Sequence, residues 1–266
     1  MIRSSPVDIY LIHMPQETRA VLKRRMIARQ LLRVLRRKLG SNLLAAGLRG
    51  SVSRGTADKY SDIDMFVVLR KLADDWPRVQ IVDGIYYGID SYTPRLALSE
   101  ISEPSPDLPE ILGGFTNLMP LYGPRGILRG LQSRAKAVPR EVFRRSAELA
   151  LLGSYEDFCR AKSAYSRRDD VVFKDNVYLV TYSAALIVAS LNQAAFASDR
   201  EIFKAHKTFL RLPRHYERIE KLRYGNLQRR ELFRVLLDFY LNLVEFCERE
   251  GISLPVSRRV LKAARV

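Results

Sequence analysis

Two apolar runs, residues 43–48 and 63–69, enclose a polar segment with the pattern G-S-x-x-R-G-T-x-x-x-x-S-D-I-D. The second run, IDMFVVL, follows polar residues and is rich in apolar side chains, which is typical of a buried strand. Side chains at positions i and i+2 of a strand point to the same face. Asp62 and Asp64 are therefore predicted to project side by side where the chain enters its core.

Two neighbouring carboxylates repel each other unless a cation lies between them. Their hard oxygen atoms suit Mg²⁺, which takes its remaining ligands from phosphate and water. Asp90 ends a neighbouring apolar run and can supply a third carboxylate from an adjacent strand. Three acids around one or two divalent ions are the arrangement used for in-line phosphoryl or nucleotidyl transfer. A polar turn with solvated carboxylates is the alternative for a bare D-x-D pair, but the full pattern between two strands favours the metal site.

The residues that follow the first apolar run suit phosphate oxygens. Gly50 and Ser51 turn the chain and offer backbone N–H groups and a hydroxyl. Arg54 adds a fork-shaped donor, and Gly55 and Thr56 let the chain swing toward the second strand. The sequence thus predicts a nucleotide-binding segment, with Gly50, Ser51, Arg54 and Thr56 as contacts, next to the carboxylates.

The apolar spacing changes near Pro124 from a mixed pattern to a helical one. We therefore predict an α+β fold with an N-terminal mixed-sheet domain over residues 1–125 and an all-helical C-terminal bundle over residues 126–266. In the first domain we expect a basic helix over 16–39, a loop or surface segment over 99–110, and strands over 43–48, 63–69, 79–92 (which a hairpin at Asp83-Gly84 can interrupt) and 117–123. In the bundle we expect helices over 139–168, 174–197, 199–210 and 228–250.

The chain is strongly basic, with 45 Lys and Arg against 29 Asp and Glu and a formal net charge of +16. The excess is confined to residues 1–40 and 138–266, at +8 each, while residues 41–137 are neutral. Such flanks attract polyanions, either nucleic acid or nucleotide phosphates. A surface adapted to high temperature is the alternative explanation.

Only Cys159 and Cys247 are present, which indicates a reduced, cytoplasmic setting. The N-terminal residues lack the long apolar run and cleavage pattern of a signal peptide. Residues 176–198 carry no charge, but polar side chains interrupt them, so a buried bundle helix is favoured over a membrane span.

The motif resembles that of the nucleotidyltransferase superfamily, which includes DNA polymerase β, poly(A) polymerase and the aminoglycoside nucleotidyltransferases. More narrowly, the chain resembles kanamycin nucleotidyltransferase, an antibiotic-adenylating enzyme. GSVSRGTADKYSDIDM carries the likeness, and residues 212–260 resemble that enzyme's C-terminal helices in spacing. Asp64 stands where that enzyme has Glu, but Asp is common at this position in the wider superfamily.

By this resemblance, Asp62, Asp64 and Asp90 would be catalytic and would hold one or two Mg²⁺ ions. Ser51 and Arg54 would contact the triphosphate of ATP or another NTP. The family completes its site across a homodimer, so a homodimer is implied here as well.

One helical segment, SYEDFCRAK, resembles the family segment in which a catalytic Glu precedes a basic side chain by four residues. Glu156 and Arg160 occupy these positions and would share one helix face. Glu156 would take the proton from an acceptor hydroxyl, while Arg160 would reach a nucleotide phosphate. An ordinary surface ion pair is the alternative.

The sequence hypothesis is Mg²⁺-dependent transfer of AMP from ATP to a hydroxyl of an aminoglycoside-like small molecule. One alternative is a transferase that modifies an RNA end or a partner protein. Another is a non-catalytic, antitoxin-like binding module with a dormant site. The Gly-Ser pair and all three acids are present, which favours activity.

Overall fold

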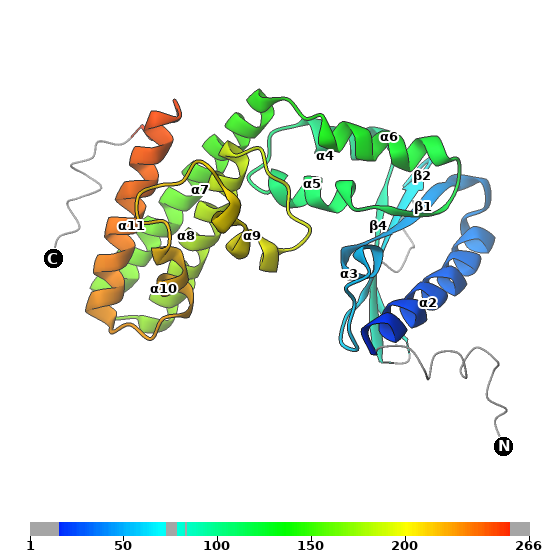
Figure 1. Ribbon diagram of the computed structural model, residues 1–266, viewed down its shortest axis with the longest axis horizontal. Coiled ribbons are helices and arrows are strands. Elements are labelled where there is room, and N and C mark those ends of the chain that lie inside the picture. Colours follow the sequence, from blue (N-terminus) through cyan, green and yellow to red (C-terminus); the bar gives the residue numbers. More distant parts are fainter. Residues whose placement is uncertain (1–15, 73–78, 83, 256–266) are drawn as a thin grey trace, which may run out of the picture. The chain divides into compact units, whose positions relative to one another are not determined.

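The protein is described by a computed structural model in which residues 16–72, 79–82 and 84–255 are defined. It divides into two compact units (Figure 1). The first comprises the described residues up to Ile101 together with Leu112–Ala137, and the second comprises Ser102–Ile111 and the described residues from Val138 onward.

The first unit is built on a mixed five-stranded sheet with the order β3-β4-β2-β1-β5. The central strand β2 pairs in parallel with β4 and antiparallel with β1, and the edge strands β3 and β5 are antiparallel to their neighbours. The predicted strands are confirmed, and the expected 79–92 strand is divided by a turn that includes Gly84; Asp83 lies outside the described residues. The strands are β1 (Leu43–Arg49), β2 (Ile63–Leu69), β3 (Val79–Val82), β4 (Ile85–Tyr92) and β5 (Met119–Tyr122).

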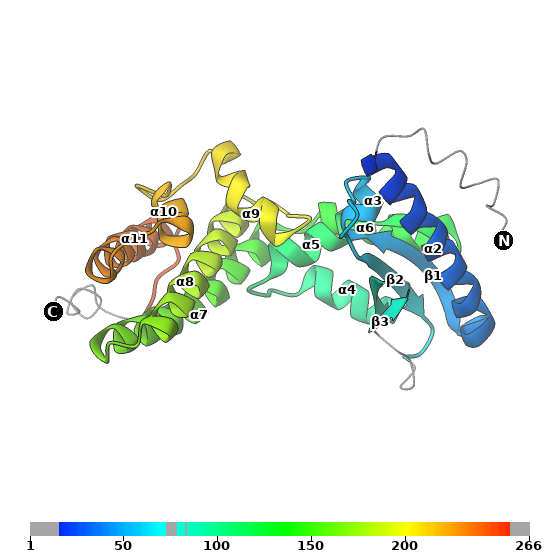
Figure 2. The ribbon, with the colours of Figure 1, turned by 90° about the horizontal axis from the view of Figure 1, so that it is seen from below.

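The two faces of this sheet pack against different helices. On one face, Met65 and Val67 of β2 join a buried cluster with Leu35 of α2 (Gln16–Leu39), the helix predicted over these residues (Figure 2). Because side chains alternate along a strand, Asp64 and Phe66 face the opposite side. There Phe66 packs edge-on against Phe115 of α5 (Leu108–Thr116), with ring centroids 5.4 Å apart.

The predicted loop or surface segment over residues 99–110 is a loop only in part, because only residues 103–107 lie outside helices. Helices α4 (Pro94–Ser102) and α5 cover most of this segment. Proline is favoured in the first turn of a helix, where its missing N–H has no partner to lose, and Pro94 and Pro109 stand at such positions. Buried Ile101 and Leu112 anchor the two helices. Pro109 therefore marks a helix start, whereas Pro104 and Pro106 lie in the non-helical stretch between α4 and α5.

The second unit is all-helical, as predicted, although α10 was not foreseen. Two stacked aromatic pairs lie in its core, Phe158 on Tyr240 at 4.2 Å and Tyr165 on Phe233 at 4.0 Å. Its principal helices are α7 (Arg140–Ser166), α8 (Asp170–Leu191), α9 (Asp199–Ala205), α10 (Arg218–Tyr224) and α11 (Arg229–Arg249).

The observed units divide the chain differently from the predicted boundary at 125/126. Helix α6 (Arg125–Lys136) belongs to the first unit, because it packs against β1 and buries Leu128 and Leu131. The first unit therefore extends to Ala137, and it is interrupted by the segment Ser102–Ile111, which packs with the helices of the second unit.

Helix α8 is long and apolar enough to cross a membrane by length and composition alone. However, 56% of its most apolar window is buried inside the structure, where it is the core helix of the second unit. It begins four residues before the predicted start, at an N-cap in which Asp169 accepts a hydrogen bond from the backbone N–H of Val172.

Candidate functional site

The carboxylate of Asp64 lies directly against Gly50, at the point where β1 gives way to the next segment. In the antiparallel register Arg49 of β1 stands opposite Asp64 of β2, which brings the following glycine beside the acid. A Cβ atom at position 50 would overlap the Asp64 carboxylate, and Gly50 has a φ of +68°. Glycine alone leaves this space open and adopts this backbone conformation without strain. The Gly50–Asp64 contact thus explains why the motif needs its first glycine.

The surroundings of Asp64 disfavour its negative charge. Burial raises the pKa of Asp64 to about 6, and the neighbouring charges of Asp62 and Asp90 also raise it. The guanidinium groups of Arg49 and Arg54 act in the opposite direction without compensating fully. A bound cation would relieve this imbalance, because positive charge near a carboxylate favours the ionised form.

Asp90 is the third predicted acid, and it is bound to an arginine. Parallel pairing sets Asp64 opposite Gly88 and Phe66 opposite Asp90, so the two acids are diagonal neighbours whose Cα atoms lie ~8 Å apart by ordinary strand spacing. The Asp90 carboxylate forms an ion pair with Arg49.

The predicted three-carboxylate metal cluster is not formed in this structure. Within residues 16–72, 79–82 and 84–255, no three acidic, histidine or cysteine side chains are gathered closely enough to hold a metal ion. The physical reason is the Arg49 guanidinium, which already compensates the charge of Asp90. Asp62 and Asp64 remain as a pair of carboxylates that fits a divalent cation.

The predicted phosphate-binding segment is a short helix, α3 (Gly50–Arg54), followed by a left-handed glycine. The carbonyl of Ser51 accepts hydrogen bonds from the backbone N–H groups of Gly55 and Thr56, the latter at 3.0 Å. Arg54, in the last turn, is close enough for its charge to act on Asp64. The structure therefore brings Gly50 and Arg54 to Asp64, and it places Ser51 and Thr56 on the same segment.

Two arginines of α2, which were not predicted as site residues, bind main-chain carbonyls of the connection between β1 and β2. Arg25 donates to the carbonyl of Val52 at 3.1 and 3.3 Å, and Arg24 donates to the carbonyl of Ser61 at 2.6 Å. Arg24 is only 3% exposed, although it is charged. Its position four residues before buried Ala28, on the apolar stripe of the helix, is the signal that could have identified it.

Glu100 and Tyr92 are further residues that were missed. They are hydrogen-bonded to each other, and burial raises the pKa of Tyr92 to about 12 and also raises the pKa of Glu100. The charge of Arg49 opposes both shifts, while that of Asp90 reinforces them. Arg49 is thus the positive centre of an acidic group on one face of the sheet, formed by Asp64, Asp90 and Glu100.

Glu156 and Arg160 lie on α7 in the second unit and form an ion pair of 2.6 Å, with side chains that are 65% and 59% exposed. The predicted spacing of four residues therefore produces contact on one helix face. Beside them Asp157 is half-buried, and this burial raises its pKa. The catalytic role of the pair remains a prediction.

Residues 28–101 match the family model of the nucleotidyltransferase domain, and this range contains the acids Asp62, Asp64 and Asp90. The chain carries a nucleotidyltransferase domain. It is accordingly a transferase enzyme. The resemblance read from the sequence motif is confirmed.

Two aminoglycoside nucleotidyltransferases (4′), one from Staphylococcus aureus and one from a Bacillus species, are each 21% identical to this chain over 226 residues. Each alignment covers 84% of this chain and 89% of the relative, so the similarity extends well beyond the nucleotidyltransferase domain.

The fold is also similar to a solved nucleotidyltransferase-like protein from Exiguobacterium sibiricum, with a TM-score of 0.54 and 10% sequence identity. This alignment covers 84% of this chain and 75% of that protein. It confirms the fold class, a nucleotidyltransferase sheet followed by helices.

Proposed function

We propose that this nucleotidyltransferase moves AMP from ATP to a hydroxyl group of an acceptor and releases pyrophosphate. The observation that carries the proposal is the Asp62–Asp64 pair, with Asp64 seated against Gly50 and its pKa raised to about 6. A carboxylate held in such an unfavourable state is typical of a functional site. The match of the surrounding residues to the nucleotidyltransferase domain supports the same reaction.

Asp62 and Asp64 are the proposed ligands of Mg²⁺, and Asp90 would complete the set once Arg49 no longer holds it. Bound Mg²⁺ would screen the phosphate charge and polarise the phosphoryl group. Ser51 and Arg54, together with Gly50 and Thr56 on the same segment, would orient the triphosphate beside these acids. The positive charge of Arg54 would offset the charge that develops on the leaving pyrophosphate.

Glu156 is proposed as the base for the acceptor hydroxyl, with Arg160 as a phosphate contact. The same helix offers a matched control, because Arg144 and Glu148 also form an i,i+4 ion pair of 2.6 Å. A base removed by Glu156→Gln should lower kcat by about 10² to 10⁴-fold. Glu148→Gln should leave kcat unchanged, and equal kcat values for the two variants would remove Glu156 from the mechanism.

An aminoglycoside-like small molecule is the first candidate for the acceptor. Both aminoglycoside relatives are similar to this chain over 84% of its length. The charge of the chain is the argument against it, because an aminoglycoside is itself a polycation and the protein has a net charge of +16.

RNA is the second candidate, and the basic surface of α2 favours it. A hollow of about 770 Å³ near the end of this helix is lined by Arg33, Arg36, Arg37, Gly40, Ser41 and Tyr122. The Arg36 guanidinium lies 4.8 Å from the centre of the Tyr122 ring. Among the residues that the structure describes, none of the three arginines is ion-paired with a carboxylate, so phosphate groups could bind them.

The proposed function is tested with the four NTPs, each carrying a radioactive α-phosphate. Transfer of this label to an acceptor is measured in the presence of Mg²⁺ or of a chelator. Parallel reactions contain aminoglycosides, tRNA or no acceptor. We expect Mg²⁺-dependent transfer with ATP as the preferred donor and an aminoglycoside as the labelled product. Label on tRNA would select the RNA candidate, and transfer that persists with the chelator would overturn the metal assignment.

The absence of both transfer and nucleotide binding would instead favour the dormant binding module. Label on a co-purified protein would favour a protein acceptor. Sedimentation of the purified chain tests the proposed homodimer.

A further inference from the structure

Arg49 occupies an unusual position in the sheet. It is the last residue of β1, and its side chain extends past β2 to Asp90 on β4, because β2 lies between these two strands. The Arg49 and Asp90 side chains are 30% and 44% exposed, so the ion pair is partly shielded from water. A Cβ atom at Gly114 of α5 would lie 3.6 Å from Nη1 of Arg49, so the helix lines one side of the guanidinium.

The charge of Arg49 is shared among several acidic groups. It acts on Asp64, on Glu100 and on the Tyr92 hydroxyl, in addition to its direct contact with Asp90. One guanidinium therefore stands among three carboxylates. A divalent cation bound among these carboxylates would reduce their mutual repulsion more strongly than the single charge of Arg49 does.

We propose that Arg49 is a positioning residue that holds Asp90 as an internal counter-ion and yields it when a divalent cation and the nucleotide bind. The proposal rests on the proposed function, which makes Asp90 a metal ligand. Arg49 and the metal ion are then alternative partners of one carboxylate. A stronger ion pair therefore weakens metal binding, and bound metal weakens the ion pair, because the two equilibria are linked.

The released guanidinium requires a new anionic partner, since a partly buried charge without one is unfavourable. The triphosphate is the nearest candidate, because Arg49 directly precedes the Gly50–Ser51 pair proposed to contact it. A guanidinium can bind phosphate oxygens in a bidentate manner. Arg49 therefore opposes binding of the metal alone and favours binding of the nucleotide.

The experiment measures Mn²⁺ binding to the nucleotide-free protein from the electron paramagnetic resonance signal of free Mn²⁺. We expect Arg49→Met to bind Mn²⁺ about tenfold more tightly than the unsubstituted protein, which is within the range usual for coupled charges. The same variant should bind ATP more weakly in calorimetric titrations. Arg129→Met is the matched control, because Arg129 is an exposed arginine of the same unit on α6, and it should change neither affinity.

A second set of variants separates the ion pair from a general effect of charge. In an Asp90→Asn background, Arg49→Met should raise Mn²⁺ affinity by clearly less than tenfold, because the carboxylate for which Arg49 competes is gone and only the effect of the Arg49 charge on Asp64 remains. The same tenfold gain in that background would overturn the proposal. If Arg49→Met unfolds, Arg49→Lys provides the test. The ammonium group of Lys should release Asp90 more readily than the guanidinium does, so this variant should bind Mn²⁺ more tightly than the unsubstituted protein.

The outcomes also distinguish this proposal from the proposed function. If the unsubstituted protein binds neither Mn²⁺ nor ATP and transfers no label, the proposed function fails. If it binds both and transfers label, but Arg49→Met has unchanged affinity for Mn²⁺, only the role of Arg49 is wrong.

Discussion

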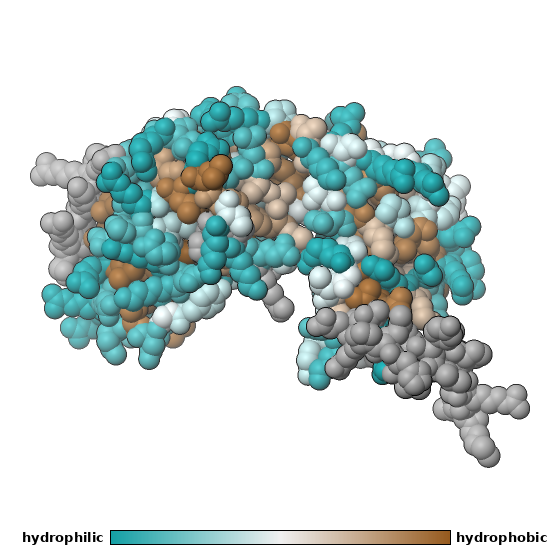
Figure 3. All heavy atoms as spheres, viewed as in Figure 1, coloured by the Kyte–Doolittle hydropathy of each residue, from teal (hydrophilic) through white to brown (hydrophobic). Residues whose placement is uncertain are grey.

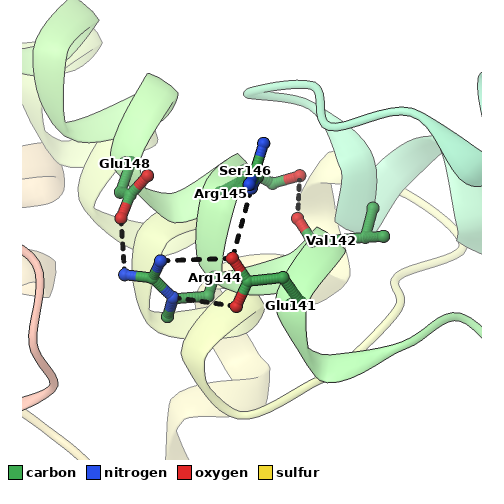
Figure 4. A network of polar contacts seen from close by, with 6 residues as sticks. All are labelled: Glu141, Val142, Arg144, Arg145, Ser146 and Glu148. Atoms are coloured by element: carbon green, nitrogen blue, oxygen red, sulfur yellow. Dashed lines mark hydrogen bonds and ion pairs between the residues drawn. The ribbon is translucent and has the colours of Figure 1, made fainter.

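The two units of this protein place their charges in opposite ways. In the first unit charged groups lie within the packed structure, as with Arg24 at 3% exposure and Asp64 with its raised pKa. In the second unit many of the charges form local pairs on helix surfaces (Figure 4). There Arg144 bonds both Glu141 and Glu148, and hydrogen bonds from Arg144 and Arg145 lower the pKa of Glu141 to about 2.

This difference indicates different roles for the two units. Charges that repel each other near a sheet reduce stability, and proteins tolerate this where a site requires it. The second unit has an apolar interior built on aromatic stacks, with hydrophilic residues over much of the face drawn in Figure 3. Substitutions of the charged site residues in the first unit should therefore lower activity without lowering stability. Substitutions in the core of the second unit should lower stability alone.

The largest effect is expected for Asp64→Asn. Transfer should fall by roughly 10³-fold or more, because a proposed metal ligand is lost. The stability of the metal-free protein should nevertheless be unchanged or higher, because the substitution removes a charge that burial and Asp62 disfavour. Label transfer and urea unfolding measure the two quantities. Asp175→Asn, on the exposed side of α8, should change neither, and a large loss of stability in Asp64→Asn would contradict the comparison.

The next effect concerns the core of the second unit. Phe158→Ala removes a fully buried ring stacked on Tyr240 and should lower the free energy of unfolding by about 3–5 kcal/mol. Leu152→Ala, on the same helix but with Leu152 51% exposed, should change it by less than about 0.5 kcal/mol. Similar losses in both variants, measured by urea unfolding, would mean that the aromatic stack is not the core of this unit.

A smaller effect is expected for Gly50→Ala, and Gly40→Ala provides its control. Both glycines have positive φ, but a Cβ atom at Gly40 would meet no atom within 4 Å. Each alanine should cost about 1 kcal/mol through backbone strain. Only Gly50→Ala should also displace the Asp64 carboxylate and lower transfer, by about 10 to 100-fold. Equal transfer rates in the two variants would show that the Gly50–Asp64 contact does not matter for the reaction.

The smallest effect is expected on the surface of α7. The pKa of Glu141 is lowered in the folded protein, so its ionised form contributes stability above its ordinary pKa of 4.5. This contribution is lost as the pH falls toward about 2. Glu141→Gln should therefore be slightly less stable than the unsubstituted protein at pH 7, and the difference in Tm should vanish toward pH 2. A difference that persists there would indicate a role other than charge pairing.

The sequence predicted the sheet and the helical half well, because their apolar spacing is regular. β2 matches the predicted 63–69 strand at both ends, so Asp64 lies on this strand and Asp62 directly precedes it. The helical ends of the 99–110 segment were missed because its prolines were all interpreted as loop signals: Pro104 and Pro106 do lie outside helices, but Pro109 stands in the first turn of α5. Local patterns do not distinguish these two uses of proline.

The partners of the acids could not be predicted in the same way. Asp90 was expected to join Asp62 and Asp64, but its ion pair with Arg49 depends on the order of three strands and on their register. Glu100 was assigned to a loop, so its position beside Tyr92 had no signal in the sequence. Strand order is a property of the whole sheet, and no short motif specifies it.

The hydrogen bonds from Arg24 and Arg25 to main-chain carbonyls have an evolutionary consequence. A hydrogen bond to a main-chain carbonyl oxygen does not depend on which side chain that residue carries. An exposed position of the connection between β1 and β2, such as Lys59, can therefore be exchanged without loss of these two contacts. Selection could alter what this segment recognises while the framework that holds it stays the same.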